Sequence, residues 1–428
     1  MVFVLKTGKS AKDPFNYRPI SLLNIIGKLL ERIIGQRYLY FLEHHNILDE
    51  FQLGFRPNRS TQQAIEIIAS KLQYNCDNRY SSMIVSSDVH KAFDTVWWRG
   101  LLHKIYHLTE DQFAITALIY NYLDRRAIEP VFNGITADVF HPKSGVPQGS
   151  SLGPILYIVF VNDIPPPLYH DTVISRFADD IGYVITSDTK TDTNATKRAQ
   201  RLIIKTKNEL KNTAKWFNNW KIKINPSKTE IGIRGITKRS IDNAGGVSIN
   251  NNRINVSNTI KILGYMFDNN KYSHSQVANK AVSAYNQVNK LYKFNQAPPK
   301  IQIYLYKMLV RPLLEYAPIR ITSSTRADIE KLQKIQNRAL RNIYHIQWWQ
   351  LITNKELHQR SKLITIKERL DKLSKKSISK FQNNFLRDSL PVPIYKYSDY
   401  EINDPPILEP KRVIRQIFNE YNRYLPLE

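Results

Sequence analysis

The sequence predicts an α+β fold with more than one core, and three observations lead to that prediction. Of the 428 residues, 42% are hydrophobic, which is enough apolar material for two or three domains. Strand-like runs at 82–88 and 174–185 alternate with segments whose apolar residues recur at helical spacing. Beyond Gly264 the chain changes to long amphipathic helices. We therefore expect a part that contains a sheet, followed by a helical part.

The elements expected in the first half are helices and one strand. In chain order they are an extended entry at Arg18-Pro19, a helix to Ile34, a helix over 36–43, a helix from the N-cap Ser60 through Leu72, a strand over 82–88, the start of a helix over 91–98 and a helix over 111–123.

The second half is expected to hold two hairpins, a long basic helix and the amphipathic helices. In chain order they are a hairpin over 128–141 that turns at Asn133-Gly134, a loop over 144–152 that opens into an apolar helix, a strand, tip and strand over 174–185, a helix over 194–219, a strand and turn over 220–233, and helices over 275–294, 300–316 and 326–346. The tail over 351–428 shows no chemistry.

The charge of the chain favours a polyanionic partner. Lys and Arg total 62 against 37 Asp and Glu, a formal net charge of +25. The chain also has 24 Tyr, 17 Phe and 6 Trp, whose rings can stack on bases beside phosphate-binding cations. A basic protein without such a partner is the alternative.

Cysteine usage and hydropathy indicate the compartment. The single cysteine, Cys76, excludes an intramolecular disulfide framework and a cysteine-rich zinc knuckle within this chain. No stretch of the chain approaches eighteen uninterrupted apolar residues, and the apolar run at the N-terminus is too short for a signal peptide. We expect a protein of the nucleus or cytoplasm, without a membrane span.

Two adjacent aspartates stand in what otherwise reads as a buried strand. Asp179 and Asp180 are expected at a hairpin tip, where two carboxylates about 4 Å apart repel by roughly 4 kcal/mol at an effective dielectric near 20. A simple turn is one interpretation, because Asp is a common turn residue. Asp88 ends the strand over 82–88 and could lie beside the hairpin, so that three carboxylates meet at one edge of a sheet.

Divalent magnesium would offset this repulsion. Mg²⁺ prefers oxygen ligands and commonly combines one or two carboxylates with substrate phosphates. Two such ions can hold the attacking and the leaving oxygen of an in-line phosphoryl displacement. The three aspartates therefore predict a site for two Mg²⁺ ions, for which Mn²⁺ could substitute.

The chain resembles the reverse transcriptases of non-LTR retrotransposons, especially the jockey-like mobile-element polymerases. The resemblance covers about 6–268 and rests on seven segments in the family's order. They are NYRPISLLNIIGKLLERII from Asn16, QLGFRPNRSTQQAI from Gln52, SSDVHKAFDTVWW from Ser86, SGVPQGSSLGPILYIVFVNDIP from Ser144, RFADDIGYV from Arg176, INPSKTEIGI from Ile224 and IKILGYMFD from Ile260.

The resemblance assigns roles to individual residues. Asp88 and Asp179 would bind metal together with the backbone carbonyl of Val89, while Asp180 would be a less direct ligand. Lys228 would be a candidate proton donor to the leaving pyrophosphate, and a solvated surface lysine is the alternative. The segment Ile262, Leu263 and Gly264 would grip the primer end, and an ordinary strand turn is the alternative.

Nucleotide-binding residues follow from the same resemblance. Phe93 matches the aromatic gate that excludes a ribose 2′-hydroxyl, although a core aromatic would also fit this position. Gln148 would touch the incoming nucleotide, and Gly149 would let the backbone approach it. Arg18 and Arg56 are candidates for the triphosphate, because Arg offers a bidentate fork to phosphate oxygens; Arg56 could instead hold template backbone.

The architecture implied is a right hand. We expect fingers over 1–80, a palm with a ferredoxin-like antiparallel sheet over 81–272, a helical thumb over 273–350, and a tail of unknown role over 351–428. In the last thumb helix a basic stripe adjoins the apolar one and could meet phosphates; it consists of Lys331, Lys334, Arg338 and Arg341.

The sequence also departs from the family pattern. No endonuclease precedes the first motif, so we expect a truncated or domesticated copy, for which a separate endonuclease could supply nicking in trans. The segment EYAPIRITSS, from Glu315, replaces the family's tryptophan-containing text. The expected function is RNA-directed DNA synthesis from a DNA primer, an RNA template and dNTPs. The alternatives are a catalytically silent nucleic-acid-binding remnant and an RNA-dependent RNA polymerase, against which Phe93 and Ala178 argue.

Overall fold

The structure is a computed structural model that describes residues 1–108, 113–187, 194–249, 252–268, 274–347 and 349–385. Its first half contains β1 (Val2–Leu5), β2 (Tyr17–Ile20), α1 (Ile25–His44), α2 (Thr61–Asp77), β3 (Ser82–Ser87), α3 (Trp98–Leu108), α4 (Phe113–Asp124), β4 (Val131–Phe132), β5 (Ile135–Thr136), α5 (Gly153–Phe160), β6 (Val173–Phe177), β7 (Asp180–Thr186) and α6 (Ala195–Asn219).

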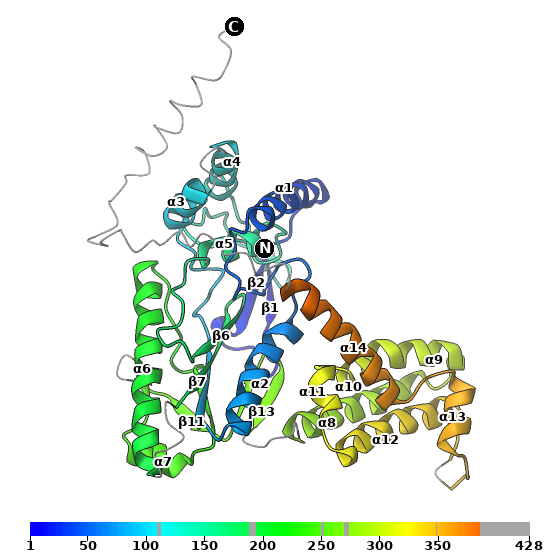
Figure 1. The fold of residues 1–428 in the computed structure, drawn as a ribbon. Helices are drawn as coiled ribbons and strands as arrows, with labels where there is room; N and C mark the ends of the chain where they lie inside the picture. The colour runs from blue at the N-terminus through cyan, green and yellow to red at the C-terminus, as the bar shows by residue number, and fades with distance from the viewer. Residues whose placement is uncertain (109–112, 188–193, 250–251, 269–273, 348, 386–428) are drawn as a thin grey trace.

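The second half adds short strands and then helices (Figure 1). They are β8 (Glu230–Arg234), α7 (Lys238–Asn243), β9 (Ser248–Ile249), β10 (Asn252–Arg253), β11 (Asn255–Ser257), β12 (Thr259–Ile262), β13 (Tyr265–Asp268), α8 (His274–Leu291), α9 (Pro299–Leu305), a π-helical turn at Tyr306–Val310, α10 (Arg311–Leu314), α11 (Pro318–Thr322), α12 (Arg326–Ile343), α13 (Asn354–Ser361) and α14 (Ile366–Phe385).

A five-stranded sheet in the order β11-β8-β3-β7-β6 forms the centre of the first part. Strand β3 pairs antiparallel with both β7 and β8, β6 and β7 form a hairpin, and only β11 runs parallel to its neighbour β8. Along the chain, helices stand between β3 and β6 and between β7 and β8, whereas β7 follows β6 directly. This is the βαββαβ unit that the sequence predicts.

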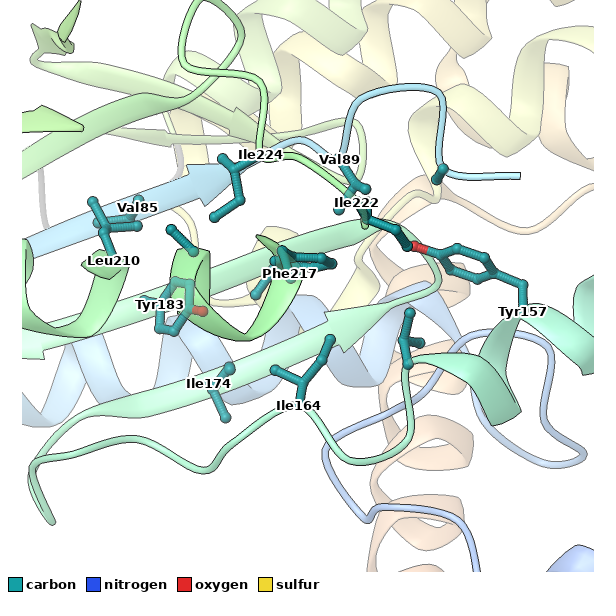
Figure 2. Packing of buried hydrophobic residues seen from close by; sticks show 14 of the residues in the cluster. Val85, Val89, Tyr157, Ile164, Ile174, Tyr183, Leu210, Phe217, Ile222 and Ile224 are labelled. Carbon is teal, nitrogen blue, oxygen red and sulfur yellow. The ribbon is translucent and has the colours of Figure 1, made fainter. Parts of the chain in front are cut away.

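Both faces of this sheet are buried, because the strands carry apolar residues at successive positions. Met83 and Val85 lie in the core that α6 covers, whereas Ile84 between them faces the cluster formed with α2 and the β12–β13 hairpin. Figure 2 shows part of the first core, in which Leu210 and Phe217 of α6 lie in one cluster with Val85 and Tyr183 of the sheet. Double coverage fixes the strand register, since a slip of one residue would exchange the two faces.

Two expected helix boundaries are wrong. Residues 25–44 form the single helix α1 rather than two helices, and Gly35 inside it marks a close approach: a Cβ there would lie 2.9 Å from Ile155 of α5. Residues 91–97 form turns, and helix α3 begins only at Trp98. The N-cap at Ser60 is confirmed, with a full capping box to Gln63.

The helical part extends beyond residue 350. Leu357, Ile366 and Leu370 of α13 and α14 are buried in the same cluster as α8 and α12, so these helices belong to one core. This part meets the sheet-containing part at α2, where Arg320 forms a bidentate ion pair with Glu66. None of the described helices combines the length and the apolar composition needed to cross a bilayer.

Candidate active site

The three predicted carboxylates lie at one edge of the central sheet. Strand β3 pairs with β7 up to Ser87↔Ile181, so the next step of this register places Asp88 opposite Asp180. Asp179 occupies the two-residue connection of the β6–β7 hairpin, whose last pair is Phe177↔Asp180. The hairpin tip expected from the sequence is therefore present, and it faces the end of β3.

Electrostatic coupling confirms that these carboxylates are neighbours. Burial raises the pKa of Asp180 to about 6, and the charges of Asp179 and Asp88 contribute to the rise. Burial also raises the pKa of Asp179, with a further contribution from Asp88, while the charges of Lys228 and Arg18 oppose it. The mutual effect of the three charges indicates that these carboxylates lie near one another, although burial is the larger cause of both shifts.

Lys228 supplies positive charge at this edge. Its Nζ lies 2.9 Å from Oδ2 of Asp88, and its side chain is 65% exposed. The backbone brings it there, since the N–H of Asn225 donates to the carbonyl of Asp88 at 2.8 Å. Val89 pairs with Ile224 in an antiparallel bridge, which ties the end of β3 to the same turn.

The residues present suit a hard divalent cation. The donor set is three carboxylates plus a backbone carbonyl, which are oxygen ligands of the kind that Mg²⁺ prefers. Among the described residues, no three acidic, histidine or cysteine side chains are grouped closely enough to form a ready-made ligand set. Asp88 instead holds the ammonium of Lys228, so a cation already sits against this carboxylate. Burial is the main cause of the raised pKa values of Asp179 and Asp180, and the neighbouring aspartate charges add to it; a bound metal ion would favour the ionised form of both carboxyls.

The hairpin tip is held by residues to which the sequence assigned no role. Ala178 has a positive φ of 58°, and its N–H donates to Oε1 of Gln52 at 2.9 Å. The N–H of Gly54 donates to the same oxygen at 2.9 Å. A Cβ on Gly54 would lie 2.3 Å from the nitrogen of Ala178, so only glycine allows this approach. The only signal in the sequence was that Gln52 and Gly54 belong to a matched motif.

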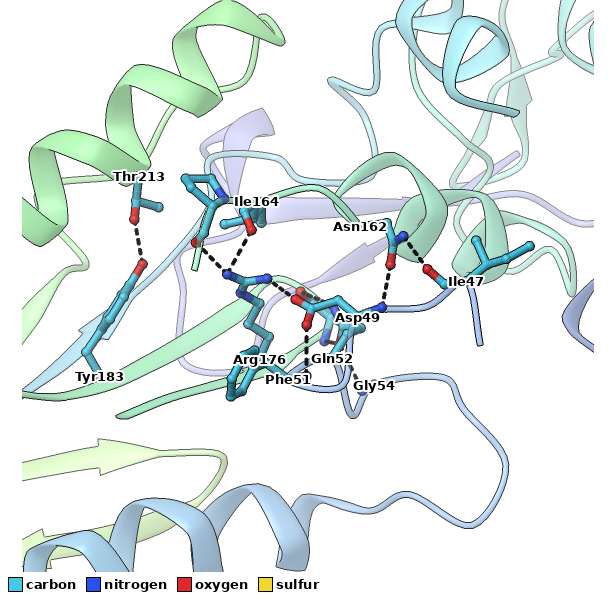
Figure 3. Close-up of polar contacts among 12 residues, drawn as sticks. Ile47, Asp49, Phe51, Gln52, Gly54, Asn162, Ile164, Arg176, Tyr183 and Thr213 are labelled. Carbon is cyan, nitrogen blue, oxygen red and sulfur yellow. Dashed lines mark hydrogen bonds and ion pairs between the residues drawn. The ribbon is translucent and has the colours of Figure 1, made fainter. Parts of the chain in front are cut away.

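Arg176 fixes the other side of the hairpin (Figure 3). Its guanidinium is 1% exposed and donates to the carboxylate of Asp49 and to the carbonyls of Ile164 and Pro165 at 3.1 and 2.9 Å. Asp49 is fixed in turn by Asn162, whose Oδ1 accepts from the Asp49 N–H at 2.7 Å. The segment before α2 thus docks directly on β6.

Phe93 lies in an aromatic cluster beside the carboxylates. Its ring stacks on Tyr157 of α5 at 4.8 Å and meets Phe55 edge-on at 6.1 Å. Tyr157 is fully buried, and burial together with the nearby aspartate charges raises its pKa well above the usual value. Phe93 itself is only partly buried, so its ring faces both this cluster and the open side.

Gln148 and Arg18 also lie near this edge. Nε2 of Gln148 donates to Oδ1 of Asp94 at 2.9 Å, and its carbonyl accepts from the N–H of Ser21 at 2.7 Å. Gly149 has a φ of 99°, and a Cβ there would lie 2.8 Å from the carbonyl oxygen of Ser21. Arg18 on β2 is exposed, and its charge lowers the pKa of Asp179.

Arg56 lies in a structural pocket rather than at the carboxylates. Its side chain is 6% exposed and forms a bidentate ion pair with Glu43, with both bonds at 2.8 Å. It also donates to the carbonyls of Asp49 and Gln52 at 2.7 and 3.1 Å. With its donors occupied by α1 and by its own loop, this guanidinium does not support the phosphate-binding role expected for it.

The segment 262–264 forms the tight turn of the β12–β13 hairpin. Leu263 and Gly264 have φ values of 49° and 78°, and Ile262 is 3% exposed on the sheet face that α2 covers. Tyr316, which precedes α11, donates its hydroxyl to the carbonyl of Leu263. This turn therefore links the sheet-containing part to the helical part, a connection that the sequence did not predict.

The four cations expected on α12 differ in what they contact. Arg341 donates to the carbonyls of Gln347 and Gln350 at 3.0 and 3.3 Å. Arg338 lies over the ring of Tyr285 at 4.4 Å, and Lys331 pairs with Asp328 at 3.1 Å. Lys334 is exposed. Lys331, Lys334 and Arg338 remain at the surface, whereas Arg341 is tied to the following loop.

The comparisons with known proteins agree with this site. The chain is 28% identical over 376 residues to the probable RNA-directed DNA polymerase from transposon X-element of Drosophila melanogaster, a match that covers 86% of this chain and 40% of the relative. It is also 28% identical over 360 residues to the RNA-directed DNA polymerase from mobile element jockey of Drosophila funebris, covering 82% of this chain and 38% of the relative. This chain thus spans about two fifths of the length of these relatives.

A solved structure of telomerase from Candida albicans, in complex with a fragment of telomeric RNA, superposes with a TM-score of 0.43 at 11% identity, covering 78% of this chain and 58% of that one. Residues 6–267 match the model of the family described as reverse transcriptase (RNA-dependent DNA polymerase). A match over more than half of the chain, with relatives of the same kind aligned over most of it, shows that this protein belongs to the reverse transcriptase family.

Proposed function

We propose that this chain is an RNA-directed DNA polymerase of a non-LTR mobile element, which extends a primer 3′-hydroxyl with dNTPs on an RNA template. The observation that carries the proposal is the meeting of Asp88 with Asp179 and Asp180 at one sheet edge. Nucleic-acid binding alone gives no reason to gather three mutually repelling carboxylates beside the ammonium of Lys228. Family membership and the net charge of +25 support the same activity.

In this proposal Asp88, Asp179 and the Val89 carbonyl hold two Mg²⁺ ions, with Asp180 tuning the site. Bound metal would stabilise the charge that develops on the phosphoryl group and would lower the pKa of the primer hydroxyl. Lys228 already carries its ammonium at this edge, where it can give a proton to the leaving pyrophosphate. Phe93 and Gln148 bound the space for the sugar, and Arg18 provides a charge for the triphosphate.

The parts of the chain then correspond to a right hand. Fingers comprise 1–80, the βαββαβ sheet and the β12–β13 hairpin form the palm over 81–272, and the helices from 273 form the thumb. Because α13 and α14 share the core of α8 and α12, the thumb in this proposal continues past residue 350. Lys331, Lys334 and Arg338 are the surface cations that it would offer to the duplex.

The test is primer extension by the purified chain on a primed homopolymeric RNA, with and without Mg²⁺. We expect extension that depends on the metal and is abolished in Asp179→Ala. Asp242→Ala is the matched control, because Asp242 is 44% exposed and pairs with Arg253 on the helix α7 side of the molecule. Extension that survives in Asp179→Ala contradicts the proposed mechanism, and a wild-type protein that binds RNA without extending the primer favours the silent remnant.

A further inference from the structure

The loop that carries Gln148 is built on the segment that carries Phe93. The N–H of Val146 donates to the carbonyl of Phe93 at 2.7 Å, and the N–H of Gly145 donates to the carbonyl of Val96 at 2.8 Å. The indole of Trp98 donates to the carbonyl of Gly145 at 2.7 Å. The turns over 91–97, which replace the helix expected there, therefore set the spacing between Phe93 and Gln148.

The side chain of Gln148 is bound by one carboxylate in this segment. Its Nε2 donates to Oδ1 of Asp94 at 2.9 Å, and Asp94 is half-buried beside Phe93. The backbone of Gln148 is held independently, because its carbonyl accepts from the N–H of Ser21. The glutamine is thus fixed at its backbone by the β2–α1 connection and at its amide by Asp94.

The chemistry of this pair permits one orientation of the amide. An ionised carboxylate only accepts hydrogen bonds, whereas an amide offers an acceptor oxygen on one side and a donor nitrogen on the other. With the amide reversed, two acceptor oxygens would stand about 2.9 Å apart, which is repulsive. Asp94 therefore turns Nε2 of Gln148 toward itself and Oε1 away from itself.

We propose that Asp94 is a positioning residue that fixes the amide of Gln148, so that Oε1 is presented as a hydrogen-bond acceptor to the incoming nucleotide. The inference rests on the proposed function, in which Gln148 contacts that nucleotide. An acceptor recognises a donor, and the donor that all four dNTPs share, whatever their base, is the sugar hydroxyl. Asp94 would thereby favour nucleotides that carry a 3′-hydroxyl over those that lack it.

The test is a double-mutant cycle with Asp94→Ala, Gln148→Ala and the combined variant, read as the KM for dNTP and as discrimination against 2′,3′-dideoxynucleotides. We expect each single variant to raise the KM about tenfold and to reduce the discrimination. If Asp94 acts through Gln148, the combined variant should be no worse than Gln148→Ala alone. Asp138→Ala, which removes an exposed carboxylate on the loop after β5, is the matched control and should leave both quantities unchanged.

Asp94→Asn is a second variant that separates the loss of the carboxylate from a loss of folding. Asn has the same shape but can present either an acceptor or a donor, so the amide of Gln148 is no longer forced into one orientation. This variant should fold and show a smaller loss of discrimination than Asp94→Ala. A merely structural role would instead lower the melting temperature and kcat, and it would add to the effect of Gln148→Ala.

The outcomes separate the inference from the proposed function. Normal KM and normal discrimination in Asp94→Ala, beside a raised KM in Gln148→Ala, overturn the inference and leave the polymerase intact. An additive cycle also overturns it. If the wild type is active and Gln148→Ala changes neither the KM nor the discrimination, Gln148 does not contact the nucleotide and the inference is overturned with it. If the wild-type chain extends no primer, the proposed function itself is overturned.

Discussion

The side-chain oxygen of Gln52 accepts a 2.9 Å hydrogen bond from the backbone N–H of Ala178, although the two residues lie 126 positions apart in the chain. Gln52 is 2% exposed and also accepts from Gly54, so one buried amide joins the loop before α2 to the tip of the β6–β7 hairpin. The position of Asp179 and Asp180 therefore depends on a segment outside the sheet that carries them.

Gln52→Leu should destabilise the protein by about 2–4 kcal/mol, because two buried N–H groups would lose their acceptor. Urea unfolding measures this change, and primer extension should fall as the hairpin loses its support. Gln73→Leu is the control, since Gln73 donates to Asp77 at the exposed surface of α2. Equal losses of unfolding free energy for the two substitutions would show that the hydrogen bonds of Gln52 stabilise the fold no more than a surface contact does.

Gly54→Ala should disturb the hairpin even more directly. The added methyl would lie 2.3 Å from the nitrogen of Ala178, so the backbone of one segment has to move. Gly8→Ala is a useful comparison, because that site has open space and its φ of 75° limits the cost to about 1–2 kcal/mol. We expect a larger loss of unfolding free energy and of activity for Gly54→Ala; a tolerated Gly54→Ala would contradict the close approach.

Phe93→Val should admit ribonucleotides into the product. The ring stacks on Tyr157 and is partly exposed, so shortening it opens space at the sugar position without removing Tyr157. The measurement is the ratio of kcat/KM for a dNTP and for the matching rNTP. Phe132→Val, on the β4–β5 hairpin, is the control. Unchanged discrimination in Phe93→Val means that the ring is not the gate.

Asp180→Asn should stabilise the metal-free protein at neutral pH. The pKa of Asp180 is raised by burial from 3.8 to about 6, so the folded state binds more protons than the unfolded state between these values. The metal-free wild type should therefore lose stability as pH rises from about 4 to 6, by roughly 2–3 kcal/mol, whereas the asparagine variant cannot ionise.

Urea unfolding with a chelator at pH 4 and pH 7 measures this difference, with Asp242→Asn as the control. Added Mg²⁺ should stabilise the wild type more than Asp180→Asn. If the difference in unfolding free energy between the wild type and Asp180→Asn is the same at pH 4 and pH 7, the pKa of Asp180 is not raised in the folded state.

Much of the fold could be predicted from local patterns. The N-cap at Ser60, the turn at Asn133-Gly134 and the strands around the carboxylates all follow from nearest-neighbour chemistry. The wrong predictions share a cause, because a tertiary contact overrides the local signal. Gly35 reads as a break but allows α1 to approach α5, and the carbonyls of Phe93 and Val96 accept from the N–H groups of Val146 and Gly145 instead of from a helix.

The grouping of the three carboxylates at one sheet edge was predictable because the metal chemistry proposed for them restricts the ligands to a few residue types. The residues that hold these carboxylates and the neighbouring loops in place were not predictable. Gln52, Asp94 and Tyr316 act through long-range hydrogen bonds, and although Gln52 and Asp94 lie in matched motifs, nothing in the neighbouring sequence assigns any of the three a supporting role. Arg56 is the converse case, because an arginine within a functional motif turned out to serve the loop itself.

The Gln52–Ala178 contact also bears on the order of folding. A two-residue hairpin turn with alanine at a φ of 58° is unfavourable by itself, and its support comes from a loop more than a hundred residues earlier. Contacts of such sequence separation form after local ones, because chain closure costs entropy first. We therefore expect the helices and the local β6–β7 pairing to form before Gln52 reaches Ala178, so that a nascent chain acquires the final geometry around the carboxylates as one of the last steps.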